Sequence, residues 1–172
     1  MMMVLKDLSR EQLEKLISDL AKRWIAHDGL WFLAAEGKFD LETAIELDTL
    51  AWEKFTVIEA KRIMDFLQLP PNGGLKALAT ALDYRLYAFL NQQVTEWVDD
   101  KTLVFKMTNC RVQSARKRKG LPDFPCKSVG LVEYSGFAKT IDPRIKTRCI
   151  ACPPDPHPEE YYCAWEFTIE DE

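Results

Sequence analysis

Five cysteines, all in the second half of the chain, are the residues best suited to chemistry. Cys149 and Cys152 form a CxxC pair, whose spacing lets two thiolates converge on one tetrahedral ion where the backbone turns. The prolines that follow this pair favour such a turn, and Cys163 returns on the next extended segment. The spacing therefore predicts that three thiols lie close together in a C-terminal hairpin.

A tetrahedral site needs a fourth ligand, and three side chains qualify. Cys126 is the first choice, and Cys110 or His157 are the substitutes. Soft thiolates match borderline or soft ions, so we expect zinc first and an iron–sulfur cluster second. The leading hypothesis is a domain that binds a metal or small ligand through Cys126, Cys149, Cys152 and Cys163. The alternative is that these thiols are inert, packed side chains.

Two other uses of cysteine are disfavoured. A redox-active CxxC pair lacks the expected setting, in which a strand opens into a helix. A cysteine nucleophile needs a base within hydrogen-bond reach, and His27 and His157 are the only histidines in the sequence. We assign no catalytic residue.

A basic stretch follows Cys110, with five cations in nine residues. Such a run can attract a small anionic molecule, and further cations come later in the chain. No aromatic side chain interleaves the run, so nucleic-acid binding is disfavoured. The candidate ligand-binding residues are Arg111, Arg116, Arg144 and Arg148.

Apolar residues at helical spacing dominate the first half of the chain. They predict helices at residues 9–27, 30–36, 41–69 and 75–91, with a break at Asp28 and Gly29. The stripe of the third helix carries Asp48 and Glu59, and buried acids need partners. The tryptophans of these helices are interpreted as core or as a dimer face.

The second half of the chain has a mixed pattern. Extended segments are expected at residues 94–98, 103–107, 146–151 and 161–169, and short helices at 110–119 and 126–140. We therefore predict one α+β domain over residues 1–172, with a helical N-terminal layer packed on a small antiparallel sheet. The helical part is residues 1–92, and the cysteine-rich mixed part is residues 93–172.

Composition narrows the class of protein. With 47% hydrophobic and 29% charged residues, the chain is typical of a globular protein, and a net charge of −4 disfavours a surface built for nucleic acid. No signal peptide or membrane span is found, so we expect a cytoplasmic protein. Thiols stay reduced in that compartment, which favours metal ligands over disulfides.

The cysteine-bearing tail resembles the C-terminal part of 4-vinyl reductase-type domains, which bind small molecules and share the fold of TRAPP vesicle-tethering subunits. The matching positions are Cys149, Ala151, Cys163 and Phe167, and Pro153 with an insertion stands where that family has Gly-Asp. Residues 31–47 and the tail also look like the bacterial L-2-amino-thiazoline-4-carboxylate hydrolase family. This resemblance implies a helical layer over a small sheet, a dimer, and a ligand pocket near the cysteines.

Two alternatives to the leading hypothesis stay open. One is a small hydrolase acting on a cyclic amide or thiazoline carboxylate, in which a metal activates water or a cysteine attacks and the basic stretch holds the carboxylate. The other is a homodimeric interaction module without metal, in which the cysteines only pack.

Overall fold

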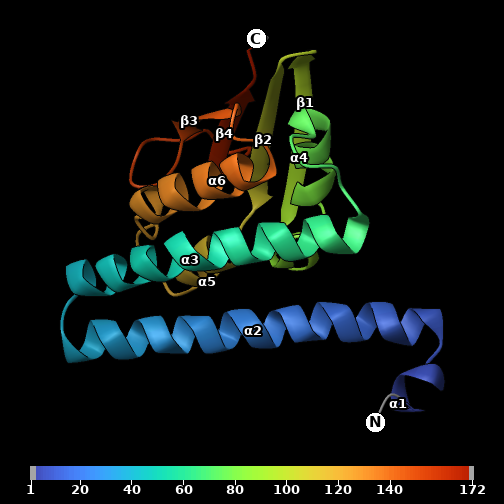
Figure 1. The fold of residues 1–172 in the computed structure, drawn as a ribbon. Coiled ribbons are helices and arrows are strands. Elements are labelled where there is room, and N and C mark those ends of the chain that lie inside the picture. The colour runs from blue at the N-terminus through green and yellow to red at the C-terminus, as the bar shows by residue number, and fades with distance from the viewer. Residues whose placement is uncertain (1–2, 171–172) are drawn as a thin grey trace.

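The protein folds into stacked layers in the computed structural model, which describes residues 3–170 (Figure 1). Helix α2 is outermost, α3 lies beneath it, and α4 and α6 lie between α3 and a four-stranded sheet. The predicted α+β architecture, with helices packed on a small antiparallel sheet, is confirmed. The elements are α1 (Met3–Lys6), α2 (Arg10–Lys38), α3 (Leu41–Leu67), α4 (Gly74–Leu82), the 3₁₀ helix η1 (Leu86–Phe89), β1 (Gln92–Asp99), β2 (Thr102–Asn109), α5 (Arg111–Arg118), α6 (Lys127–Ile141), β3 (Lys146–Ala151) and β4 (Cys163–Thr168).

Helix α2 begins where the sequence predicts and ends later. Ser9 and Gln12 form a capping box, in which each side chain accepts a hydrogen bond from the other residue's backbone N–H. The predicted break at Asp28 and Gly29 is wrong, because α2 continues to Lys38. An interior glycine costs a helix only about 1 kcal/mol, and contacts on both sides of Gly29 hold the helix together. Ile25 is buried before it, and Phe32 meets Phe124 edge to face after it.

The predicted helix over residues 75–91 is also too long. Helix α4 ends at Leu82, and η1 follows after a turn. The chain departs from the helix because Leu86 N–H donates to the Glu59 carboxylate, at 3.2 Å, and Arg85 turns inward to the same group. A buried ion pair therefore overrides the helical periodicity of this segment.

Helix α6 lies tightly between α3 and the sheet, and a glycine marks each contact. A Cβ atom at Gly136 would lie 2.7 Å from Thr56 Cγ2 of α3, and one at Gly130 would lie 2.7 Å from Cζ2 of Trp165 in β4. Thr56 Oγ1 also donates to the Glu133 carbonyl, at 2.8 Å. The close approach that glycine allows therefore fixes the distance of α6 from both neighbouring layers.

The sheet has the order β1-β2-β4-β3 and is antiparallel throughout. All four predicted extended segments contain a strand, and β3 has the expected bounds. Trp165 and Phe167 of β4 are fully buried against the helices, on the strand face that Cys163 shares by alternation. Among the described residues, no helix is long and apolar enough to cross a bilayer.

Candidate thiol site

The five cysteines lie in or next to four elements, α5, α6, β3 and β4, toward one end of the sheet. Cys110 directly precedes α5, Cys126 directly precedes α6, and Cys152 follows β3. Cys149 lies within β3, and Cys163 begins β4. All five are free thiols, and Cys152 is fully buried.

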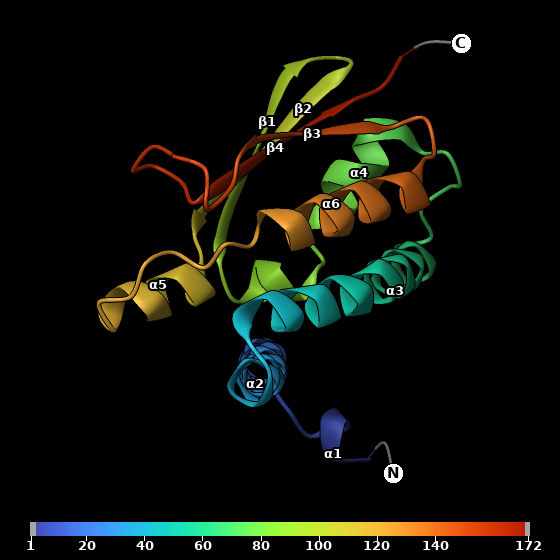
Figure 2. The ribbon, with the colours of Figure 1, turned by 90° about the vertical axis from the view of Figure 1, so that its left-hand side faces the viewer.

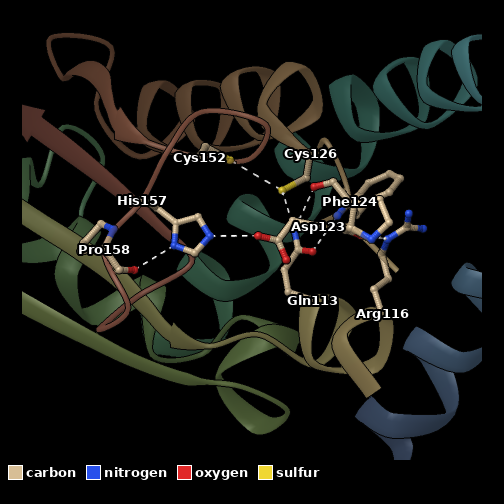
Figure 3. A network of polar contacts seen from close by, with 9 residues as sticks. Gln113, Arg116, Asp123, Phe124, Cys126, Cys152, His157 and Pro158 are labelled. Atoms are coloured by element: carbon tan, nitrogen blue, oxygen red, sulfur yellow. Dashed lines mark hydrogen bonds and ion pairs between the residues drawn. The ribbon is translucent and has the colours of Figure 1, made fainter. Parts of the chain in front are cut away.

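Cys126 and Cys152 make the central contact of the site, with a distance of 3.6 Å between their sulfur atoms (Figure 3). Two bonds from Lys127 hold the start of α6 against the loop after β3. Its backbone N–H donates to the Pro153 carbonyl at 2.9 Å, and its Nζ lies 2.6 Å from an Asp155 oxygen. These bonds place two thiols from distant parts of the chain in contact.

The pKa values of the two thiols in this pair are shifted in opposite directions. The hydrogen bond from Cys152 lowers the pKa of Cys126, and the same bond raises the pKa of Cys152 well above that of an ordinary thiol. The Cys126 sulfur also lies at the N-terminus of a 15-residue helix, where partial positive charge favours an anion. Cys126 is thus the member of the pair that more readily becomes a thiolate.

Cys163 and Cys149 extend the pair to a group of four. The Cys163 side chain contributes to the raised pKa of the Cys152 thiol, and Cys149 lies directly opposite Trp165 in the β3–β4 register. Burial raises the pKa of Cys149, and the nearby Lys127 ammonium acts against that rise. The four cysteines that the sequence predicts as first-choice ligands therefore lie in one region, in which Cys126 and Cys152 are in direct contact.

Cys110 lies at the margin of this group. It is within electrostatic range of Cys163 and Cys126, but burial raises its pKa to about 12. Its side chain packs against the apolar core. Cys110 is near enough to the other thiols to be considered as a substitute ligand. Its packing in the apolar core, however, already accounts for its position without a metal.

His157, the other substitute, is engaged elsewhere. Its Nε2 lies 3.0 Å from an Asp123 carboxylate oxygen and its Nδ1 lies 2.8 Å from the Pro158 carbonyl (Figure 3). The Asp123 hydrogen bond raises the pKa of the imidazole. Both ring nitrogens would have to give up a partner before either could bind a metal.

Gln113, which the sequence analysis did not single out, ties the loop before α6 to the thiols. Its side chain is fully buried and exchanges two hydrogen bonds with the backbone of Phe124, at 2.9 and 2.8 Å. The same Nε2 atom lies 3.5 Å from the Cys126 sulfur, as Figure 3 shows. A lone glutamine in a basic run carries no sequence signal, because its role depends on a loop 11 residues away.

The four candidate anion-binding arginines do not share one surface. Arg111 and Arg116 belong to α5, whereas Arg144 lies at the opposite end of α6 in the turn before β3 (Figure 2). Arg144 binds the buried Asp142 carboxylate, and Arg148 makes two hydrogen bonds to Glu166 across β3 and β4. Arg116 donates to the Pro122 carbonyl and lies over the Phe124 ring. These partners hold three of the four cations in structural contacts.

A buried ion group joins α6 to α3 on the side away from the sheet. Arg85 is 2.9 Å from Glu59 of α3 and 2.7 Å from Glu133 of α6, and all three side chains are buried. The contact with Glu133 is an ion pair whose atoms are not aligned as a hydrogen bond. Burial raises the pKa of Glu133 to about 7, even beside this cation. Arg85 is thus the partner that Glu59 was expected to need.

The fit of a metal to the thiols can be judged from two observations. Two thiolates on one tetrahedral zinc ion stand about 3.8 Å apart, close to the 3.6 Å between Cys126 and Cys152. The indole N–H of Trp165, fully buried opposite Cys149, has no hydrogen-bond partner in the described part of the chain, and a metal-bound thiolate is an acceptor. Among residues 3–170, no three histidine, cysteine or acidic side chains already converge as a metal site. Binding would therefore require thiol side chains to rotate.

Comparison with known proteins places the chain in one family. The chain matches a family described as a family of unknown function (DUF6125) over residues 6–169, nearly its whole length. No curated protein and no solved structure matches it. The resemblance to 4-vinyl reductase-type and thiazoline-carboxylate hydrolase families is not tested by these comparisons and stays a prediction.

Proposed function

The chain belongs to the DUF6125 family, and from its clustered thiols we propose that it binds a metal ion, zinc in the first place, through Cys126, Cys149, Cys152 and Cys163. The observation that carries the proposal is the 3.6 Å contact between two sulfurs that lie 26 positions apart in the sequence. Two polarisable thiols can be buried side by side without a metal, but this sulfur–sulfur distance is also close to that of two thiolates on one zinc ion.

The surroundings supply the charge balance that such a site needs. Four thiolates on a divalent cation carry an excess of two negative charges. The Lys127 ammonium, the N-terminus of α6, and the N–H groups of Gln113 and Trp165 all lie around the thiols. These groups favour thiolates, and they act against the burial that raises the pKa values of Cys149 and Cys152 in the metal-free protein.

The predicted chemistry is binding or sensing rather than turnover. Four protein ligands fill the coordination sphere of tetrahedral zinc and leave no position for water or substrate. The ligands come from two loops and two strands, so a bound metal would stabilise their mutual packing. The proposal includes the cytoplasmic location, since reduced thiols are required, and the homodimer that the sequence predicts.

Metal analysis of anaerobically purified protein tests this function. We expect about one zinc ion per chain in the wild type, and its loss in Cys126→Ser and Cys152→Ser. Cys110→Ser is the matched control, because Cys110 lies in the same region but is expected to be a packed side chain and not a ligand. This variant should therefore keep its zinc. A folded wild-type protein without metal, or with a disulfide between Cys126 and Cys152, would contradict the proposal.

One further variant, Cys149→Ser, decides between Cys149 and Cys110 as a ligand. We expect Cys149→Ser to weaken zinc binding and Cys110→Ser to leave it unchanged. The reverse result would replace Cys149 by Cys110 in the ligand set. The hydrolase alternative stays a prediction. Two cavities of the helical layer, one lined by α2 and α3 and the other by α3 and the segment around η1, have no cysteine in their lining.

A further inference from the structure

The contact between Cys126 and Cys152 permits a second kind of chemistry, which needs no metal. Their sulfur atoms lie 3.6 Å apart and face each other from the start of α6 and from the loop after β3 (Figure 3). A disulfide bond is about 2.05 Å long, so the two atoms would have to approach by roughly 1.5 Å. A change of the side-chain torsions can supply this movement. The pair is therefore within reach of direct crosslinking.

The backbone segments that carry the two cysteines are already held together. The Lys127 N–H donates to the Pro153 carbonyl at 2.9 Å, and these residues directly follow Cys126 and Cys152. Asp155 adds two bonds, because its N–H donates to the Cys152 carbonyl at 2.9 Å and its carboxylate lies 2.6 Å from the Lys127 ammonium. Formation of a disulfide would therefore need new side-chain torsions but no rearrangement of either segment.

The two thiols differ in exposure, which sets the order in which a small oxidant reaches them. Cys126 is partly exposed, whereas Cys152 is 1% exposed. An accessible cysteine with a second thiol in contact behind it is the arrangement of an oxidisable cysteine and its resolving partner. An oxidant would therefore react with Cys126 first and leave Cys152 as the attacking thiol.

This pair is different from the CxxC pair of the sequence. Cys149 lies in β3, opposite Trp165 of β4, and a register irregularity follows it before Ala151. Cys152 lies beyond the end of that strand, where it contacts Cys126 from 26 positions earlier in the chain. The contact partner of Cys152 is thus set by the packing of α6 and not by the spacing of the two nearest cysteines.

We propose that Cys126 and Cys152 form a reversible disulfide when the protein reacts with a hydroperoxide. The Cys126 sulfur attacks one peroxide oxygen, the O–O bond breaks, and the thiol proton passes to the leaving oxygen, which gives a sulfenic acid and water or an alcohol. The Cys152 sulfur then attacks the Cys126 sulfur, the S–O bond breaks, and the hydroxyl leaves as water with the Cys152 proton. The two thiols lose two electrons, which the peroxide accepts. Two equivalents of a small thiol restore the pair by exchange and are themselves joined as a disulfide.

Oxidation of this pair would also control the proposed zinc site, and this consequence rests on the proposed function. The thiolate is the form of cysteine that binds a metal, and a disulfide removes two of the four ligands. The oxidised protein should therefore bind zinc at least about 100-fold more weakly than the reduced protein. The crosslink itself requires no metal.

Peptide mapping of the full chain tests the crosslink. Reduced, metal-free protein is treated with a slight excess of hydrogen peroxide, the remaining thiols are alkylated, and disulfides are located by tandem mass spectrometry. We expect a Cys126–Cys152 link as the main disulfide, reversed by dithiothreitol, and the same product in the matched control Cys110→Ser. Cys152→Ser should instead keep the sulfenic acid on Cys126, which dimedone labels.

The mapping can also overturn the assignment. A main disulfide between Cys152 and either Cys149 or Cys163 would do so, and so would five unmodified thiols after treatment with excess peroxide. The wild-type protein alone decides this point, so the result does not depend on whether Cys152→Ser folds, which circular dichroism checks.

The outcomes separate this inference from the proposed function, because the oxidation is carried out without metal. A crosslinked protein whose reduced form binds no zinc would keep the disulfide and overturn the zinc site. A protein that binds zinc but gives no crosslink would do the reverse. Where both occur, equal zinc affinities of the oxidised and reduced proteins in chelator competition would overturn the control of zinc binding.

Discussion

Arg85→Met tests how strongly the buried ion group positions α6, and with it the thiol at the start of that helix. Arg85 joins Glu59 of α3 to Glu133 of α6, at 2.9 and 2.7 Å, and it is 2% exposed. Its guanidinium also lies over the Phe137 ring, 4.7 Å from the centroid. Methionine has a similar volume but leaves two buried carboxylates without a cation.

The expected loss is about 3–5 kcal/mol of unfolding free energy at pH 8, the usual cost of removing one partner from a buried ion pair. Glu133 already has a pKa of about 7 beside Arg85, and removal of the cation raises this pKa further. At pH 5 the Glu133 carboxyl would be largely protonated with or without Arg85, so less unpaired charge is buried and the loss should be smaller than at pH 8.

Urea denaturation at both pH values, followed by circular dichroism, measures these losses. The triple variant Arg85→Met, Glu59→Gln, Glu133→Gln has no buried charge in this group and should recover most of the stability at pH 8. A loss below about 1 kcal/mol at pH 8, or the same loss at both pH values, would refute the reasoning.

Three further predictions concern the packing and chemistry around the site. Gly130→Ala should lower the unfolding free energy by about 1–3 kcal/mol, because its Cβ would lie 2.7 Å from the buried Trp165 ring. Gly29→Ala, with open space around its Cβ, should raise the unfolding free energy by about 1 kcal/mol. Equal effects of the two variants in urea denaturation would contradict this reasoning. Gln113→Leu should weaken zinc affinity about 10- to 100-fold in chelator competition, because the Cys126 sulfur loses its amide donor, and an unchanged affinity would show that this donor is not used. For Asp48, the raised pKa means that the folded state holds a proton that the unfolded chain releases above about pH 4, so stability is lost as pH rises from about 4 through about 7. Asp48→Asn should therefore stabilise the fold by about 1–2 kcal/mol at pH 8 and by less at pH 5, and a gain that is equal at both would argue against a buried acid.

Much of the fold follows from local patterns in the sequence. The capping box at Ser9, the alternation of Trp165 and Phe167, and the turn after Asp99 each depend on a few neighbouring residues. The helix boundaries at Gly29 and Leu82 depend instead on tertiary contacts. Phe32 with Phe124, and Arg85 with Glu59, join residues that no periodicity relates.

The candidate site divides in the same way. The CxxC spacing and the return of Cys163 predict three of the thiols because they lie in one hairpin. The contact of Cys126 with Cys152 needs α6 to be held against the loop after β3 by Lys127, and no local pattern encodes that bond. Gln113 was missed because its partners come from the loop before α6. The dispersal of the four arginines reflects ion pairs with Asp142 and Glu166 across turns and strands.

The measurement that tests the central claim most directly is a Co²⁺ titration of the reduced, metal-free protein, followed by absorption spectroscopy. Four thiolates around tetrahedral cobalt predict intense visible bands and strong sulfur-to-cobalt charge-transfer absorption that saturate at about one equivalent and disappear when zinc is added. Cys152→Ser should lose the bands, and Cys110→Ser should keep them. A wild-type protein that stays folded and gives only the weak spectrum of hydrated cobalt would contradict the thiolate metal site.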